Sequence, residues 1–222
     1  MTRAYGQYCG LAKALELVGG RWSLLIVREL LTGPKRYTEL QHGLPGIPTN
    51  ILSTRLRELE EAGLVERSLL AHSSSVVYGL TGYGLELEEA VVRLGVWGSK
   101  SLGRPGADAS FSLSALALAM RGAFDPSKAT GRDLLLEIRL GDEPPLVVMV
   151  SEGRVSFPTE TPSKPIVVET APEVMSELLV GSLDARAAVA SGRARIDGSV
   201  AEVRRFFGVF RLPAREPIPS EP

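Results

Sequence analysis

The segment TNILSTRLRELEEAGL, residues 49–64, carries the side chains whose types and spacing are best suited to chemistry. Leu52, Leu56 and Leu59 repeat at i, i+4 and i+7, which predicts a helix over residues 49–62 with one apolar face. By the same periodicity Arg55 lies between the two faces. The outward face then carries short polar groups and one cation, namely Asn50, Ser53, Thr54 and Arg57.

Such a face suits the major groove of DNA. Asparagine can pair with adenine, arginine can bind guanine or a phosphate, and serine and threonine can reach either bases or backbone. Thr49 can cap the start of the helix and is counted with the candidate DNA-binding residues. The alternative is an ordinary amphipathic helix exposed to solvent, and the helix alone does not separate the two.

Three further candidates, Lys35, Arg36 and Tyr37, precede a short helix expected at about residues 37–42. Side chains at such a position normally face the DNA backbone, and the amides at the helix start could help to bind phosphate. A solvated loop explains these residues almost equally well.

The hairpin expected after the 49–62 helix departs from the usual pattern of a DNA-reading wing. Its tip, residues 71–75, has no lysine or arginine, so we expect it to add little specificity. His72 could donate weakly to a phosphate. Arg67, at the base of the hairpin, is the better candidate for a backbone contact.

Catalysis and metal binding find little support. The chain has two histidines and one cysteine, and it shows no nucleophile elbow, Cys/His cluster, Walker-type loop or GxGxxG after a strand. We therefore expect no enzymatic activity, no metal and no cofactor. Residues 1–104 carry a net charge of +2 and the remainder −3, so DNA affinity would depend on the local placement of cations.

Periodicity and turn residues predict the elements that position these side chains. In the first half, helices are expected at 10–18, 22–31, about 37–42 and 49–62, strands at 64–69 and 76–80, and a further helix capped by Thr81. The first helix has Leu11, Leu15 and Val18 on one face, and the last has Leu87, Val91 and Leu94. A short third helix, a turn and a polar-faced fourth helix before a hairpin predict a winged helix-turn-helix.

A linker is indicated at about residues 103–110 by the run Gly103-Arg104-Pro105-Gly106. We therefore expect two domains, residues 1–104 and 105–222, and an α+β fold class. The second domain should contain a helix at 111–122, strands at 133–140, 145–150, 153–157, 165–170 and 193–198, and helices that begin near Pro172, Asp184 and Ser199.

The N-terminal half resembles the HxlR-type regulators, a winged-helix branch close to the MarR group. The likeness is carried by Cys9, GGRWSLLIVRELLTGPKRYTEL (19–40), LPGIPTNILSTRLRELEEAGLVER (44–67) and VVYGLTGYG (76–84), and it covers almost all of residues 8–100. The resemblance implies a DNA-binding transcriptional regulator. It also implies a homodimer whose interface is built by the first and last helices of this domain, bound to a roughly palindromic operator.

Cys9 matches the position of a thiol that some HxlR-type relatives use for redox sensing, which makes it a candidate redox thiol. A sensor thiol should be exposed and should have a lowered pKa. The adjacent residues Tyr8 and Gly10 supply no cation, and free cysteines are usually buried. We therefore favour a half-buried cysteine at a helix start or a dimer interface.

The C-terminal half resembles the sterol-carrier-protein-type domains, through its strand order and the segment ASGRARIDGSVAEVRRFF (190–207). This resemblance implies a small α/β domain in which a five-stranded sheet, with helices on one face, encloses an apolar cavity. The candidate pocket residues are apolar: Val174, Leu178, Phe206, Phe207 and Phe210. An ordinary core between the helices and the sheet would use the same residue types.

Two functions remain open, and an enzyme that acts in the C-terminal cavity is a third with less support. The first is a dimeric DNA-binding regulator whose C-terminal domain senses an apolar small molecule or supports assembly. The second is a lipid- or acyl-binding carrier that uses the winged helix only for dimerisation or docking. The chain lacks both a signal-peptide apolar block and an apolar run approaching the roughly 18–20 residues that span a bilayer, so we expect a soluble cytoplasmic protein.

Overall fold

The computed structural model describes residues 4–69, 75–102, 111–131, 133–159, 161 and 163–211. The chain divides into two compact units, Met1–Arg93 and Leu94–Pro222. This division lies inside helix α6 (Glu88–Ser99), whereas the linker expected at 103–110 lies outside the described residues. The predicted domain boundary at residue 104 therefore stays a prediction.

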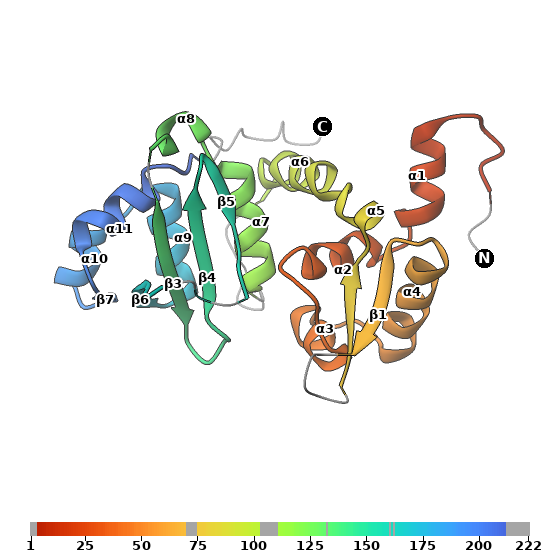
Figure 1. Ribbon diagram of the computed structural model, residues 1–222, viewed down its shortest axis with the longest axis horizontal. Helices are drawn as coiled ribbons and strands as arrows, with labels where there is room; N and C mark the ends of the chain where they lie inside the picture. Colours follow the sequence, from red (N-terminus) through yellow and green to blue (C-terminus); the bar gives the residue numbers. More distant parts are fainter. Residues whose placement is uncertain are drawn as a thin grey trace, which may run out of the picture. The chain divides into compact units, whose positions relative to one another are not determined.

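The first unit has the element order of a winged helix-turn-helix (Figure 1). It contains α1 (Gly10–Val18), α2 (Ser23–Leu30), α3 (Tyr37–Gly43), α4 (Thr49–Glu61), the antiparallel strands β1 (Val65–Leu69) and β2 (Val76–Leu80), and α5 (Gly82–Leu85). Thr81 caps α5, since its hydroxyl oxygen accepts a hydrogen bond from the Gly84 amide at 3.0 Å. The helices and strands expected from the sequence are confirmed up to Thr81, but the single helix expected after it is wrong: α5 and α6 are separate, and Leu87 lies between them.

The core of the first unit is built by the apolar stripe of α4. Leu52, Leu56 and Leu59 are buried against side chains of α2 and α3, such as Ile26 and Leu40. Burial of this stripe removes apolar surface from water and fixes which face of α4 is left outside. Because the leucine stripe faces the core, the opposite, polar face of α4 is directed to solvent.

The apolar faces expected on α1 and α6 are only partly buried by the rest of the chain. Val18 is buried, but Leu11 is 70% exposed and Leu15 is also exposed. On α6, Val91 is buried whereas Leu94 is exposed. The sequence pattern is correct for a helix in each case, but the chain itself does not cover the whole of either stripe.

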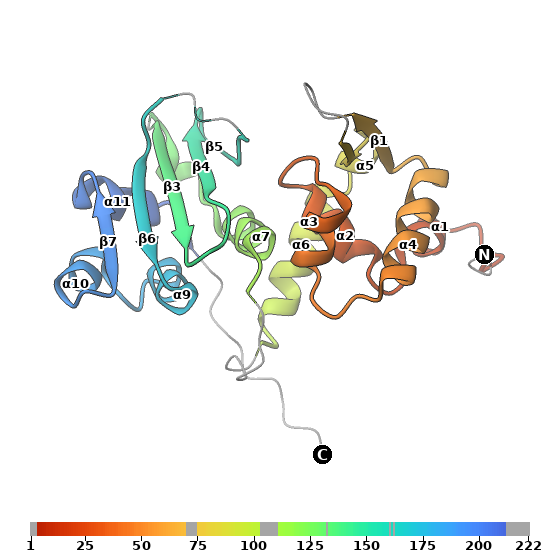
Figure 2. The same cartoon turned by 90° about the horizontal axis from the view of Figure 1, so that it is seen from below.

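The second unit is a five-stranded mixed sheet packed with helices. The strands β3 (Leu134–Leu140), β4 (Leu146–Ser151), β5 (Arg154–Ser156), β6 (Ile166–Thr170) and β7 (Ala194–Asp197) lie in the order β5-β4-β3-β6-β7. β3 runs parallel to β6, and the other neighbours are antiparallel. Figure 2 shows β3 between β4 and β6.

The helices of the second unit are α7 (Leu113–Ala123), α8 (Pro126–Ala129), α9 (Pro172–Val180), α10 (Ala185–Ala190) and α11 (Val200–Phe207). Alternate strand residues, such as Leu136 and Val148, are fully buried in one core with Met120 of α7, Met175 of α9 and Phe206 of α11. The helices therefore cover one face of the sheet. The expected sheet of five strands is present, and the likeness to sterol-carrier-type domains stays a prediction.

Candidate nucleic-acid interface

The outward face of α4 presents the polar residues that the sequence singled out. Asn50 and Ser53 are exposed, Thr54 is half-buried, and the Arg57 side chain is 69% exposed. The expected cap at Thr49 is wrong: Pro48 is the N-cap, with extended backbone, and Thr49 is the first helical residue, with an exposed side chain. The fixed φ of proline suits the entry into a helix, so the capping position falls one residue earlier.

Tyr37 connects α3 to the start of α4. Its hydroxyl donates to the Thr49 carbonyl at 2.8 Å and lies 3.2 Å from the Ser53 Oγ. A tyrosine hydroxyl has one proton, so when it is given to Thr49 the Ser53 hydroxyl must donate to the tyrosine oxygen. Ser53 is then left with acceptor capacity, which suits an amino group of adenine or cytosine.

Two other side chains on this face differ in the hydrogen-bond donors and acceptors that they have left for DNA. The Thr54 hydroxyl donates to the Asn50 carbonyl at 2.8 Å, so it too has only acceptor capacity left. The Asn50 amide has no hydrogen-bond partner among the described residues. Because an amide carries both donors and an acceptor, Asn50 is the residue on this face best equipped for a two-bond contact with adenine.

The acidic residues of α4 lie in its C-terminal half, and each is paired with an arginine. Arg55 bonds Glu58, Arg67 lies 2.6 Å from Glu60, and an exposed pair at 4.0 Å joins Arg57 to Glu61. The first turn of α4 contains no acidic residue, so the positive end of the helix dipole is not offset there. The electrostatics therefore favour a phosphate near the start of α4.

The segment before α3 is held by the hairpin. The Lys35 amide donates to the Tyr78 carbonyl at 2.9 Å, and the Lys35 carbonyl accepts from the Tyr78 amide at 2.8 Å. The Arg36 amide donates to the Glu39 carboxylate at 2.6 Å, and the Arg36 side chain is exposed. A solvated loop is therefore the wrong description of Lys35. A single bridge residue has no periodicity by which the sequence could have shown it.

The base of the wing is tied back to α4. The hydrogen bond and charge of Glu60 raise the pKa of Arg67, so a phosphate at Arg67 would have to compete with that carboxylate. The contact proposed for Arg67 stays a prediction. Residues 70–74, which include His72, lie outside the described residues.

Glu29 is a structural residue that the sequence analysis missed. It is only 2% exposed on α2, and its Oε1 lies 2.6 Å from Arg28 Nη2. An added Cβ at Gly43 would lie 2.5 Å from Glu29 Oε2, so the end of α3 packs directly on this carboxylate. Glu29 therefore fixes the position of α3 relative to α2. The sequence shows only an acidic residue within the apolar run of α2, and its burial becomes visible only in the folded chain.

Cys9 is exposed in the single chain and lies at the start of α1, so the expected place at a helix start is confirmed, whereas its burial at a dimer interface stays a prediction. It is the N-cap residue of α1. The amides of Ala12 and Leu11 lower the pKa of the thiol, because a thiolate accepts hydrogen bonds from the start of a helix. No neighbouring cation is needed for this effect.

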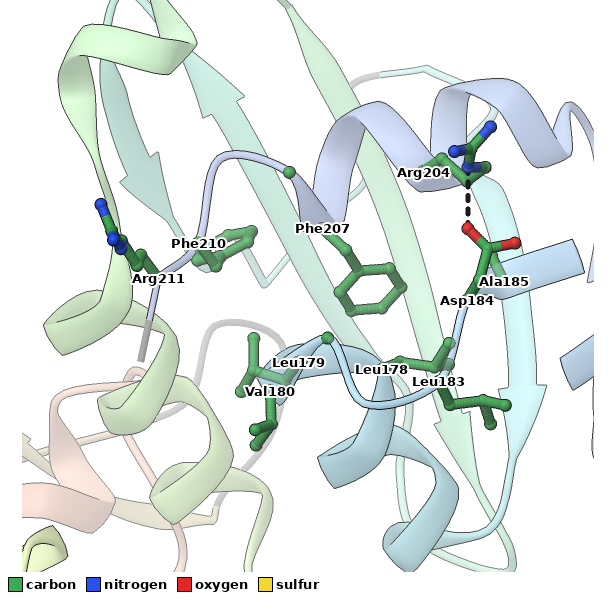
Figure 3. A pocket seen from close by; sticks show the side chains of 12 residues that line it. Leu178, Leu179, Val180, Leu183, Asp184, Ala185, Arg204, Phe207, Phe210 and Arg211 are labelled. Atoms are coloured by element: carbon green, nitrogen blue, oxygen red, sulfur yellow. Dashed lines mark ion pairs between the residues drawn. The ribbon is translucent and has the colours of Figure 1, made fainter. Parts of the chain in front are cut away.

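A cavity of about 370 Å³ lies in the second unit between α11 and the segment that joins α9 to α10 (Figure 3). Leu178, Phe207 and Phe210 contribute to its lining, as expected. Val174 and Phe206 do not line this cavity: both are buried in the core, where the Phe206 ring packs 5.1 Å from that of Phe210. Helix periodicity cannot tell which apolar residue faces a core and which faces a void.

One edge of the cavity is polar. Arg204 Nε lies 2.8 Å from Asp184 Oδ2, and this ion pair connects α11 to the N-cap of α10. The Arg211 side chain belongs to the lining as well. The cavity therefore has an apolar wall and a charged rim, which is more polar than the sequence analysis expected.

Within the described residues, no group of three or more His, Cys, Asp or Glu side chains could hold a metal ion. None of the described helices has the length and apolar character needed to cross a bilayer.

Comparison with known proteins relates the first unit to a family of regulators. The HxlR-like helix-turn-helix family matches residues 17–105. An uncharacterized HTH-type transcriptional regulator of Mycobacterium tuberculosis is 47% identical over 96 residues, which is 42% of this chain and 59% of that protein. The chain thus spans less than two thirds of this relative. The HTH-type transcriptional regulator YodB of Bacillus subtilis is 38% identical over 85 residues, which is 38% of this chain and 76% of YodB.

Among solved structures, the redox regulator HypR in its oxidized form is 32% identical, with a TM-score of 0.40, over 43% of this chain and 99% of that chain. Quinone-bound YodB from B. subtilis is 33% identical, with a TM-score of 0.36, over 40% of this chain and 96% of that one. The sequence match to YodB covers most of that regulator, and the family match at residues 17–105 includes most of the winged helix-turn-helix described above. This chain belongs to the HxlR-like helix-turn-helix family.

Proposed function

We propose that this protein is a DNA-binding transcriptional regulator that acts as a homodimer on a roughly palindromic operator. The single observation that carries the proposal is the outward polar face of α4. It exposes Asn50, Ser53 and Arg57 on a helix that the buried leucine stripe holds with this face outward. No catalytic reaction is assigned to the chain.

Exposed apolar side chains on α1 and α6 support the dimer. Leu11 and Leu15 on α1 are exposed, as are Leu94 and Trp97 on α6, and Trp97 reaches 72%. Groups of exposed apolar side chains on a water-facing helix mark surfaces that a partner covers. A second copy would bury them and would place two α4 helices on successive major grooves, about 34 Å apart.

The DNA contacts are tested by fluorescence anisotropy with the DNA upstream of the protein's own gene and with random DNA, over a series of salt concentrations. Asn50→Ala and Arg57→Ala should each weaken binding to the upstream DNA by roughly 1–3 kcal/mol, because each removes one base or phosphate contact. Arg195→Ala is the matched control. This arginine is likewise exposed and lies 3.8 Å from a glutamate, but it is in the second unit.

Size-exclusion chromatography with light scattering should show that the Asn50 and Arg57 variants keep the oligomeric state of the parent. A parent protein with no salt-sensitive preference for its upstream DNA would contradict the proposal. Loss of binding in the Arg195 control would show that the effect is not specific to α4.

The cavity of the second unit supports a further part of the proposal, that this unit binds a small molecule and thereby shifts the population of DNA-binding dimers. Its apolar wall includes Leu178, Phe207 and Phe210. The carrier function uses the same cavity but needs no DNA. Mass spectrometry of molecules that copurify with the protein, combined with the anisotropy series, distinguishes the regulator from the carrier. A carrier would copurify with its ligand, and the α4 variants would alter neither ligand binding nor any specific DNA binding.

A further inference from the structure

Arg55 makes contacts that its place between the two faces of α4 does not predict. Its Nε donates to the Arg21 carbonyl at 3.2 Å, and its Nη1 bonds the Glu58 carboxylate on the next turn of α4. The side chain is only 23% exposed. Unlike Arg57, which is directed to solvent, Arg55 is directed to the loop between α1 and α2.

The loop that receives Arg55, residues 19–22, is called here the α1–α2 corner. An added Cβ at Gly20 would lie 3.0 Å from both Cζ and Nη1 of Arg55, so the guanidinium rests directly on the Gly20 backbone. The corner itself is closely defined. The Ser23 amide bonds the Gly20 carbonyl at 3.0 Å, and Trp22 has a φ of +80°. Arg55 therefore binds a shaped backbone site and not an open surface.

We propose that Arg55 is a positioning residue for DNA recognition, which holds α4 against the α1–α2 corner and so sets the direction of its polar face. This inference rests on the function proposed above. The leucine stripe attaches α4 by non-directional apolar contact, which tolerates small rotations. A planar guanidinium that bonds one carbonyl and one carboxylate does not tolerate them, and lysine cannot make the same pair of contacts.

The rival explanation is that Arg55 binds a phosphate directly. The two explanations differ on random DNA, where affinity depends on phosphate contacts. Each cation that neutralises a phosphate contributes about 0.9 to the slope of log affinity against log salt concentration. If Arg55 binds a phosphate, Arg55→Gln lowers this slope on random DNA. If it positions α4, the slope on random DNA stays at the parent value.

Gly20→Ala provides a test that leaves every charge in place. The methyl group would displace the flexible end of Arg55 and would also lie 3.1 Å from the Ser23 Oγ, and no positive φ at residue 20 opposes alanine. We expect Gly20→Ala and Arg55→Lys each to reduce the preference for upstream over random DNA roughly tenfold, the loss of one charge-assisted hydrogen bond. The double variant should lose no more than either single one, since both break the same contact.

Gly82→Ala is the matched control, because an added Cβ there meets no atom within 4 Å. Hydrogen exchange at the α4 amides should rise in Gly20→Ala and remain unchanged in Gly82→Ala, which gives a readout without DNA. Parent-like DNA preference and exchange in both Gly20→Ala and Arg55→Lys would overturn this inference alone. A parent protein without any preference for upstream DNA would overturn the proposed function and this inference together.

Discussion

Gly43→Ala should destabilise the first unit, although the same change in most helices does the opposite. Alanine is favoured over glycine inside a helix by about 1 kcal/mol. Gly43 ends α3, and an added Cβ there would lie 2.5 Å from Oε2 and 2.9 Å from Cδ of Glu29. Contacts this short require one of the two groups to move.

The magnitude follows from how firmly Glu29 is held. Its side chain is almost fully buried, and Oε1 lies 2.6 Å from Arg28 Nη2, so it cannot turn to solvent without leaving the ion pair. Forcing an extra methyl group into a packed site costs about 1–3 kcal/mol. The gain of about 1 kcal/mol in helix propensity offsets part of this cost, so we expect the free energy of unfolding of the first unit to fall by up to about 2 kcal/mol.

Urea denaturation followed by Trp22 fluorescence measures this change, in a Trp97→Phe background that leaves one tryptophan, in the first unit. Gly82→Ala controls for the substitution itself. In a Glu29→Ala background the clash is absent, so Gly43→Ala should no longer destabilise. A Gly43→Ala protein that is as stable as its parent, or more so, would refute the assignment of Glu29 as the group that fixes the end of α3.

Three further outcomes test other parts of the structure. The rate of alkylation of Cys9, the single cysteine, should reach half its maximum at a lower pH than that of an unstructured cysteine peptide, because helix amides lower the thiol pKa; an equal midpoint would contradict this. The hydrogen bonds from Arg193 lower the pKa of Glu177 below 4.5, so the stability that this pair contributes is present above that pH and is lost as the pH falls through the folded pKa. In Glu177→Gln the melting temperature should therefore fall less steeply with decreasing pH than in the parent. An identical pH dependence in the two proteins would show that the pair does not contribute to stability. Phe206→Ala should cost about 3–5 kcal/mol of stability, as for a fully buried ring, and Phe207→Ala, at the cavity wall, clearly less; equal losses would place both rings in the core.

Most of the order of elements could be predicted from the sequence because it depends on local periodicity, although the short helix α8 and the break between α5 and α6 were not. Leu52, Leu56 and Leu59 can share a buried face only in a helix, and that face leaves Asn50 and Arg57 outside. The candidate interface is therefore a property of one segment, 49–62, and it is visible without the rest of the chain. The five strands of the second unit follow in the same way from short apolar runs and turn residues.

Other features depend on residues that meet only after folding. Arg55 and Arg21 are 34 positions apart, and the contact of Glu29 with Gly43 joins two helices across a loop. Periodicity records which face a residue occupies, not which distant backbone atom its side chain reaches. For the same reason the sequence shows the apolar stripe of Leu11 and Leu15, whereas only the tertiary structure shows that the chain leaves this stripe exposed. Burial is decided by what packs against a helix, and no single segment contains that information.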